Sequence, residues 1–343
     1  MQMNERLLTS VRELIRNRVG LTLDGSRHRR RLRNALENRC EESDHESLSR
    51  YVAGLSDAKG DDELQELIDE LVVNETLFYR NRSQMECVQE TIYPELLERD
   101  RDVLRVLSAG CSTGAEPYSL VLAYLQLTET RSFLDQIPEL ECTGVDVSSR
   151  AVRHARRGQY SRRAVENAPS EIVSKYFREE EDGYRLLPEV RERVQFRQRN
   201  LLESPLPPDQ DLILNRNVQI YFDEEDRRRI TRKLHGALND GGFLVLGHSE
   251  NPDVVRRMFR SGESLGDSIF RKSSSKQSPG TRDESRKTKL DVQEGRGLGS
   301  ESGRVSECSS LEENDRVSLN QDQDVVRLVL SGRIDVRGDR DFK

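Results

Sequence analysis

The sequence predicts an α/β fold in which a small, all-helical domain precedes a doubly wound parallel sheet. Apolar residues recur at helical spacing in residues 1–75, as at Leu8, Val11 and Ile15. In residues 100–272, short apolar runs alternate with amphipathic helical stretches, which is typical of a parallel sheet with helices on both faces. From Ser273 onward, Ser, Gly, Glu and Arg dominate, so we expect residues 273–343 to form a mostly disordered tail.

These patterns divide the chain into residues 1–75, 76–272 and 273–343. The predicted strands are Val103–Leu107, Glu141–Val147, Gln195–Arg197, Asp211–Leu214 and Phe243–Leu246. The predicted helices between them are Pro117–Gln126, Ser149–Arg157 and Glu224–Leu238. The polar segment 160–195 predicts a small inserted subdomain with a hairpin around Asp182-Gly183. In the tail, Val325–Leu330 and the following Ser331–Ile334 predict a strand and a turn, which are too short to make a domain.

Composition limits the class of protein. The net charge is −7, so nothing global indicates a nucleic-acid partner. No run of about 20 apolar residues exists that could span a membrane, and the charged N-terminus lacks the apolar core of a secretion signal. The Cys residues stand at positions 40, 87, 111, 142 and 308, without metal-ligand spacing. They indicate reduced thiols in the cytoplasm and no zinc site.

Two segments predict a nucleotide site at the end of the sheet. The loop Gly110–Gly114 follows the first strand and precedes a helix, where glycines let the backbone approach a ligand. Asp146 ends the second strand, where an acid can bind ribose hydroxyls. The alternatives are an ordinary strand-to-helix turn and an N-terminal helix cap at Asp146. Together the two favour an adenosine-containing ligand, without separating a nicotinamide cofactor from S-adenosylmethionine. The loop lacks the G-x-G-x-x-G pyrophosphate pattern, which weighs against a dinucleotide.

Three further segments carry polar and aromatic side chains. They are Asn74–Arg80, at the seam between the helical and α/β regions, Asn215–Asp223, just after the fourth predicted strand, and Gly241–Glu250. Each has an ordinary structural alternative. Arg80 could form a surface ion pair, Tyr221 could be a core aromatic with a solvated hydroxyl, and His248 is more often a structural loop residue than a catalyst.

In this order and at this spacing, the five segments resemble the CheR-type protein-glutamate O-methyltransferases of chemotaxis. The sequence stretches that carry the resemblance are NETLFYR at 74–80, SAGCSTGAEPYS at 108–119, TGVDVS at 143–148, NRNVQIYF at 215–222 and GGFLVLGHSE at 241–250. The resemblance extends over about residues 5–272. It implies a helical N-terminal domain and a Rossmann-like, S-adenosylmethionine-dependent methyltransferase domain, with S-adenosylhomocysteine as product and no metal.

The resemblance also implies roles for individual residues. Arg80 would bind the methionyl carboxylate and Glu116 the methionyl ammonium, while Asp146 would hold the ribose. Tyr221 would lie nearest the methyl group, as the expected catalytic residue. The remaining cofactor-binding residues would be Asn74 and Thr76 at the domain seam, Asn200 and Leu201 around the adenine, and Arg216 and Asn217.

Several residues depart from the family pattern. Ala115 replaces the first of two acids, although Glu116 is kept, Tyr79 replaces a Phe and Leu107 a Trp. Asn215 stands in place of a common Cys, and Gln219 in place of an apolar residue. Because Asn215 and Gln219 flank the edge of the sheet where the active site is expected, we expect them to affect the reaction rate or the choice of substrate and not cofactor binding.

A dense basic stretch at residues 27–33 predicts a docking face for an acidic substrate. Helical spacing places Arg27, Arg30 and Arg31 on one side, where they could steer the glutamate-rich cytoplasmic domain of a methyl-accepting chemoreceptor. A solvated helix face and a nucleic-acid site are the alternatives, and the absence of interleaved aromatics disfavours the second. We expect a cytoplasmic monomer. A different methyl acceptor and a catalytically silent adaptor remain the rival functions.

Overall fold

The computed structural model describes residues 5–57, 60–130, 136–261 and 268–273. The chain divides into two compact units, Met1–Thr281 and Arg282–Lys343, and all described residues belong to the first. The tail was predicted at residues 273–343, and all of it except Ser273 lies outside the described residues, including Cys308 and the predicted Val325–Leu330 strand. The boundary predicted near residue 75 stays a prediction, because the N-terminal helices and the sheet belong to the same compact unit.

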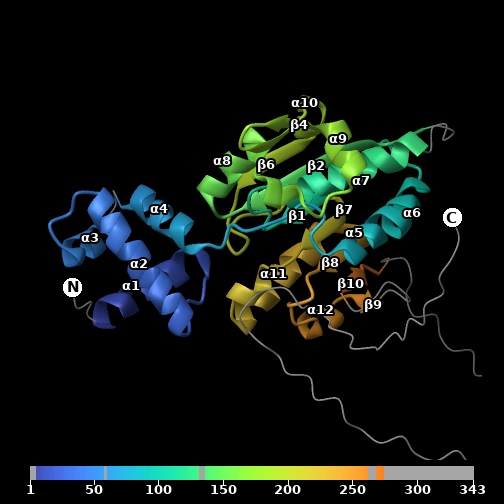
Figure 1. Ribbon diagram of the computed structural model, residues 1–343. Coiled ribbons are helices and arrows are strands. Elements are labelled where there is room, and N and C mark those ends of the chain that lie inside the picture. The colour runs from blue at the N-terminus through green and yellow to red at the C-terminus, as the bar shows by residue number, and fades with distance from the viewer. Residues whose placement is uncertain (1–4, 58–59, 131–135, 262–267, 274–343) are drawn as a thin grey trace, which may run out of the picture. The chain divides into compact units, whose positions relative to one another are not determined.

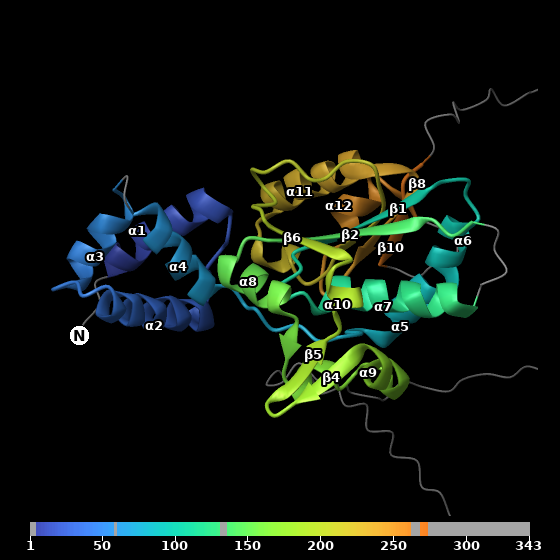
Figure 2. The ribbon, with the colours of Figure 1, turned by 90° about the horizontal axis from the view of Figure 1, so that it is seen from above.

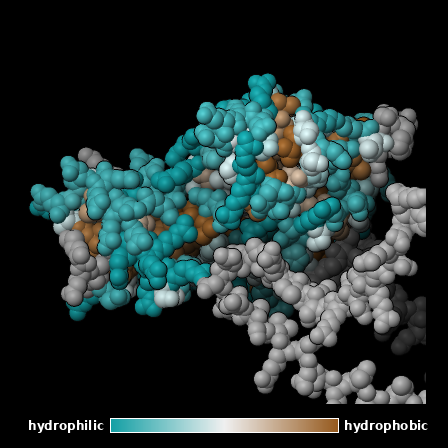
Figure 3. All heavy atoms as spheres, in the orientation of Figure 1, coloured by the Kyte–Doolittle hydropathy of each residue, from teal (hydrophilic) through white to brown (hydrophobic). Residues whose placement is uncertain are grey.

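The chain begins with four described helices, as the periodicity predicted (Figure 1). They are α1 (Glu5–Val19), α2 (Ser26–Glu42), α3 (Leu48–Leu55) and α4 (Asp61–Leu71). Leu8, Val11 and Ile15 of α1 are buried, because their spacing places them on one face. Ser47 caps α3 by accepting a hydrogen bond from the backbone N–H of Arg50. The opposite faces are polar, and the visible surface over these helices is mostly hydrophilic (Figure 3).

A helical stretch that the sequence analysis did not predict precedes the sheet. It consists of α5 (Arg82–Cys87), the π-helical turn η1 (Val88–Ile92) and α6 (Tyr93–Leu97). Met85, Val88 and Ile92 are buried in the core. The π-turn changes the residue spacing, and Pro94 would ordinarily signal a break, so periodicity alone gives a weak signal here.

The main sheet has the strand order β6-β2-β1-β7-β8-β10-β9. Its strands are β1 (Val103–Ala109), β2 (Glu139–Asp146), β6 (Val194–Gln198), β7 (Gln210–Asn215), β8 (Leu238–Leu246), β9 (Arg260–Ser261) and β10 (Ile269–Arg271). The predicted strands are the five that pair in parallel from β6 to β8. The antiparallel pairs of β10 with β8 and β9 were not predicted, because β9 and β10 are very short.

Helices cover both faces of this sheet. They are α7 (Ala115–Thr130), α8 (Ser149–Arg157), α11 (Glu224–Ala237) and α12 (Asp253–Arg256). Seen from above, α7 lies on one side of the strands and α11 and α12 lie on the other (Figure 2). Side chains of β1 alternate between two core clusters: Leu104 and Val106 belong to the one that contains the buried residues of α7, and Leu107 belongs to the one that contains those of α11. The predicted doubly wound α/β architecture is therefore confirmed.

A small antiparallel sheet of order β3-β5-β4 forms between α8 and β6. Its elements are β3 (Gln159–Tyr160), the 3-10 turn η2 (Arg162–Val165), α9 (Ser170–Tyr176), β4 (Phe177–Glu180), β5 (Gly183–Leu186) and α10 (Pro188–Arg191). Strands β4 and β5 form a hairpin in which Glu180 pairs with Gly183, at the predicted turn.

Candidate functional site

The candidate site lies at the carboxyl ends of the parallel strands. Ala109 pairs with Val145, Asp146 pairs with Gln198, and Asn215 pairs with Leu246. The loops that follow β1, β2, β6, β7 and β8 therefore leave the sheet along one edge, where ligands of doubly wound sheets bind. These loops carry four of the five predicted motifs.

The glycine-rich loop after β1 is held to the end of β2. The backbone N–H groups of Gly110 and Cys111 both donate to Val145 O, at 2.8 and 3.0 Å. Gly110 has φ +93° and Gly114 has φ +89°. A Cβ at Gly110 would lie 2.2 Å from Val218 Cγ2, so packing against protein also requires glycine there. These glycines were predicted from the need for a ligand to approach, and backbone conformation and close packing are further reasons for glycine at these positions.

Asp146 joins the glycine-rich loop to the start of α8. Its Oδ2 accepts from the backbone N–H of Ser112 at 2.7 Å, and its Oδ1 accepts from that of Ser148 at 2.9 Å. The N-cap of α8 is Ser148, whose hydroxyl accepts from Ala151 N, so Asp146 is not the helix cap. Burial raises the pKa of Asp146 above its ordinary value, and the two backbone N–H groups oppose that rise.

Glu116 forms a buried ion pair with Arg216. Arg216 Nε lies 2.8 Å from Glu116 Oε2, and the Ser108 hydroxyl donates to Glu116 Oε1 at 2.7 Å. Arg216 also donates to Arg80 O at 2.8 Å and to Gln84 Oε1 at 3.3 Å. Both predicted binding residues are thus engaged with protein groups. Arg216 connects β7, α7 and the segment that contains Arg80.

Arg80 lies in a tight turn between two residues with left-handed backbone conformation. Tyr79 has φ +52° and Asn81 has φ +57°, which is unusual for residues other than glycine. Arg80 is half-buried, and within the described part of the chain its guanidinium has no hydrogen-bond or ion-pair partner. The alternative of a surface ion pair is therefore not what the structure shows. Thr76 is half-buried nearby in sequence, and Asn74 Nδ2 lies 3.4 Å from the Ser148 hydroxyl.

The predicted adenine-binding residues follow β6. Asn200 Nδ2 donates to Arg18 O and its Oδ1 accepts from Leu202 N, both at 2.9 Å, so this side chain links the loop to α1. Leu201 is buried in the core. A pocket of about 240 Å³ adjoins this loop and is lined by Asn200 and Leu202 together with residues of α1 and α11.

Lys233 of α11 holds the same loop, and sequence reasoning did not identify it. Its Nζ donates to Leu201 O, Leu202 O and Ser204 O at 2.8, 2.8 and 2.7 Å. Burial lowers the pKa of Lys233. In the sequence, this lysine looks like any other cation on the polar face of an amphipathic helix.

Tyr221 ends a 3-10 turn, η3 (Gln219–Tyr221), after β7. The carbonyl of Tyr221 accepts from both the backbone N–H and the hydroxyl of Thr22, each at 2.9 Å. Asn217, with φ +57°, precedes this turn. The loop between α1 and α2 therefore contacts the segment that carries the predicted catalytic residue.

Asn215 and Gln219, which depart from the family pattern, form a buried pair. Gln219 Nε2 donates to Asn215 Oδ1 at 2.8 Å, and Asn215 Nδ2 donates to Ala109 O at 2.7 Å. The two departures satisfy each other, and they connect the end of β1 to the 3-10 turn.

His248 and Glu250, in the loop after β8, occupy different environments. His248 is exposed, and its Nδ1 lies 3.3 Å from Asn81 Nδ2, which fits a structural loop residue. Glu250 is buried, and its Oε1 accepts from Val218 N at 2.8 Å. Burial raises the pKa of Glu250. Glu250 thereby ties this loop to the loop after β7.

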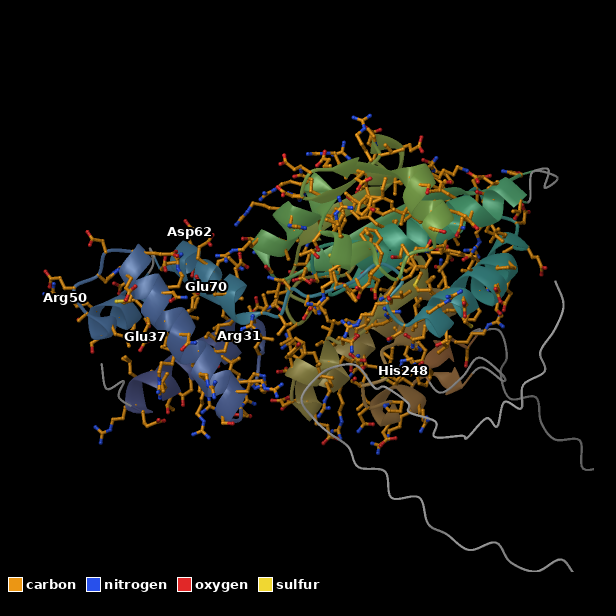
Figure 4. The ribbon with its side chains drawn as sticks, viewed as in Figure 1. Arg31, Glu37, Arg50, Asp62, Glu70 and His248 are labelled. Atoms are coloured by element: carbon orange, nitrogen blue, oxygen red, sulfur yellow. The ribbon has the colours of Figure 1, made fainter. Side chains whose placement is uncertain are left out.

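The structure separates Arg31 from the other predicted docking residues. Arg31 NH2 donates to Glu70 O at 3.2 Å and to Val72 O at 2.8 Å, at the carboxyl end of α4 (Figure 4). Unsatisfied carbonyls at a helix end attract such cations, which the spacing on α2 could not reveal. Arg27 and Arg30 are exposed on α2. Arg31 therefore has protein partners, whereas Arg27 and Arg30 face solvent, and docking through the three residues stays a prediction.

The described residues contain no group of three or more His, Cys, Asp or Glu side chains placed to hold a metal ion. Among the helices in the described ranges, none combines the length and apolar character that a membrane crossing needs.

Comparison with known proteins identifies the family. Residues 74–264 match the family model described as CheR methyltransferase, SAM binding domain. The chain belongs to the CheR methyltransferase family. The matched CheR segment contains all nine residues predicted to bind cofactor, from Asn74 to Asn217.

Two relatives that carry the name chemotaxis protein methyltransferase match a larger share of the chain than the family model does. Chemotaxis protein methyltransferase 2 of Vibrio cholerae is 34% identical over 267 residues, covering 75% of this chain and 91% of its own length. Chemotaxis protein methyltransferase 1 of Pseudomonas aeruginosa is 33% identical, covering 70% of this chain and 88% of its own.

Similarity to solved structures is weaker. The glycopeptide N-methyltransferase MtfA complexed with S-adenosyl-L-methionine matches at 16% identity with a TM-score of 0.27. That match covers 46% of this chain and 48% of the MtfA chain, so the chain spans about half the length of that structure. A likeness of this size carries no argument about activity.

Proposed function

We propose that this CheR-family protein transfers a methyl group from S-adenosylmethionine to glutamate side chains of chemoreceptor proteins, forming methyl esters. Family membership supports methyl transfer, and the relatives' names support a role in chemotaxis. The observation that carries the proposal is the convergence of the matched motifs at the carboxyl edge of the sheet, with Asp146 and Arg80 among them. Chemoreceptor glutamates face the cytoplasm, so we propose that the reaction occurs there.

The residues at this edge fit S-adenosylmethionine. The Ser112 hydroxyl is buried and has no hydrogen-bond partner among the described residues, next to the Asp146 carboxylate. The half-buried Arg80 guanidinium is likewise without a described protein partner, and its planar fork suits the methionyl carboxylate. We propose that Asp146 holds the ribose and that Glu116, with Arg216 beside it, faces the methionyl ammonium. When bound, the cofactor supplies an electrophilic methyl group on a sulfonium.

The same proposal gives the other predicted residues supporting roles. Asn200 and Leu201 would border the adenine, on a loop held by Lys233. Asn74 and Thr76 would close the site from the segment after α4, and Asn217 would complete it from the loop after β7.

The reaction needs little acid-base chemistry from the protein. A glutamate side chain has an ordinary pKa of about 4.3, so it is already ionised at neutral pH. The protein must hold the carboxylate in line with the methyl group and exclude water from the nucleophile. We propose that Tyr221 shapes the methyl pocket and orients the acceptor. The hydrogen bond from the Thr22 hydroxyl to the carbonyl of Tyr221 would hold its backbone in place for this role. This explains why the motifs contain no catalytic triad.

The acceptor would dock through the exposed arginines of α2. Arg27 and Arg30 face solvent, and a positive field there would attract a glutamate-rich helix and raise its association rate. Arg31 would contribute indirectly, by fixing α2 to the end of α4.

The proposal is tested with radioactive methyl transfer. The full chain is incubated with methyl-labelled S-adenosylmethionine and a chemoreceptor cytoplasmic fragment, and label released by mild base is counted. A fragment whose methylated glutamates are replaced by alanine is the matched control. Base-labile label on the first fragment alone is expected. A folded protein that binds S-adenosylhomocysteine but labels neither fragment would instead support the silent adaptor, and base-stable label would indicate a different acceptor.

A further inference from the structure

Asp69 of α4 is a buried carboxylate that belongs to none of the recognised motifs. It is 2% exposed. Its Oδ1 accepts from Ser149 N at 3.0 Å and from Gln65 Nε2 at 2.9 Å. Its Oδ2 accepts from the Ser149 hydroxyl at 2.6 Å and from Arg150 N at 2.9 Å. A buried charge is tolerated only when it is well satisfied, and both oxygens of this carboxylate are.

These contacts join an N-terminal helix to the first turn of α8. Asp69 meets the free N–H groups at the start of that helix, where a negative charge is favoured. Gln65 Nε2, which also contacts Asp69, donates to Val147 O at 3.1 Å. Helix α4 therefore holds the chain on both sides of Ser148.

The turn held by α4 is the one that presents Asp146. The Asp146 carboxylate accepts from Ser148 N and from Ser112 N, so its position depends on that turn and in turn fixes the glycine-rich loop. Hydrogen bonds at either end of the Ser148–Ser149 backbone thus connect Asp69 to Asp146, and through Asp146 to the loop after β1. In sequence, Asp69 and Asp146 are far apart, and no spacing links them.

We propose that Asp69 is a positioning residue for the cofactor site, acting through the first turn of α8 on Asp146. The proposal rests on the proposed S-adenosylmethionine site and deepens it. The helical domain is then part of the cofactor-binding structure as well as the carrier of the docking arginines. Because Ser148 already caps α8, Asp69 is not needed to begin that helix, and its distinct contribution is to fix where the turn lies relative to Asp146.

A positioning role and a merely stabilising role predict different results. A merely stabilising residue would lower the melting temperature and leave cofactor affinity unchanged in the folded protein. A positioning residue changes affinity at temperatures far below melting, where the whole population is folded. The dissociation constant of S-adenosylhomocysteine, measured by titration calorimetry on the full chain, separates the two.

The experiment compares the parent with three variants. Asp69→Asn keeps the size of the side chain but places an amide N–H against donors, and we expect it to weaken S-adenosylhomocysteine binding about tenfold. Ser149→Ala removes one of the contacts to Asp69, and we expect a weakening of about threefold. Asp62→Asn is the matched control on the same helix, where Asp62 is exposed (Figure 4), and its affinity should equal that of the parent.

Parent affinity in folded Asp69→Asn and Ser149→Ala proteins would overturn the inference, and so would equal weakening in Asp62→Asn. If Asp69→Asn does not fold, Ser149→Ala and Gln65→Met decide the question in the same way. A parent protein that does not bind S-adenosylhomocysteine would refute the proposed cofactor itself, and the inference with it.

Discussion

Replacing Gln219 with leucine is expected to lower the free energy of unfolding by about 1–3 kcal/mol, because it leaves a buried acceptor without a donor. Gln219 is 1% exposed and Asn215 is fully buried. Gln219 Nε2 lies 2.8 Å from Asn215 Oδ1, and solvent cannot replace that donor at a site this deeply buried. The apolar side chain of leucine offsets this loss only in part. The lost hydrogen bond therefore decides the sign of the change in the free energy of unfolding.

The same change should slow methyl transfer. Asn215 Nδ2 donates to Ala109 O at 2.7 Å, immediately before the glycine-rich loop, and Gln219 begins the 3-10 turn that ends at Tyr221. Loss of the Gln219 contact frees the Asn215 amide to rotate, which disturbs both sides of the site. We therefore expect a lower turnover number with a smaller change in S-adenosylhomocysteine affinity.

Urea unfolding followed by circular dichroism measures the stability change. Gln195→Leu on β6 is the matched control, because that glutamine is exposed, and it should stay within about 0.5 kcal/mol of the parent. The double variant Asn215→Cys with Gln219→Leu should cost less than the two single changes added together, since it leaves no unpaired amide behind. A loss below about 0.5 kcal/mol in Gln219→Leu, or strict additivity in the double variant, would refute the reasoning.

Four further predictions concern the cofactor, the tail and the docking helix. Asp146→Ala should weaken S-adenosylhomocysteine binding severely in a folded protein, because it removes the acid that we propose to bind the ribose; unchanged calorimetric affinity would contradict the assignment. Truncation after Lys272 should keep methyl transfer to a receptor fragment at the parent rate, since the composition of the removed segment cannot bury a core; a large loss of turnover would show the tail to be part of the catalytic unit. The double charge reversal Arg27→Glu and Arg30→Glu should raise the Michaelis constant for the receptor fragment and flatten its salt dependence, with cofactor affinity unchanged. If the double variant and the parent have identical receptor kinetics at low salt, these two arginines are part of a solvated helix face and not of a docking face. Arg31→Glu should instead lower the melting temperature, because Arg31 holds the end of α4.

Much of the fold could be predicted because its signals are local. Helical spacing in α1 and short apolar runs such as Val103–Leu107 depend only on neighbours in sequence, and each appears as expected. The helical stretch 82–97 and the strands after Arg260 could not be predicted in this way. A π-turn disrupts the helical period in the first case, and strands of two or three residues are formed by pairing rather than by pattern in the second.

The candidate site shows the same division between local and long-range information. Arg31 illustrates it, because its spacing on α2 predicted a docking residue on the same side as Arg27 and Arg30, whereas the carbonyls that it binds belong to Glu70 of α4 and to Val72 just after it. Asn215 and Gln219 illustrate it as well. In the sequence, each is a separate departure from the family pattern. Only the structure shows that the Gln219 amide donates to the Asn215 amide oxygen.

The sequence by itself determined the alternation of strands and helices, the five motifs and their order, and through them the family. These properties are set by local composition and by residue types that can be read in one dimension. The tertiary structure alone decided that Lys233 holds the loop after β6, that Thr22 binds the carbonyl of Tyr221, and that Asp69 holds the turn beside Asp146. Each of these is a polar group satisfied by an element remote in sequence. Which remote carbonyl or amide a buried side chain meets depends on how the elements pack, and no spacing along the chain encodes it.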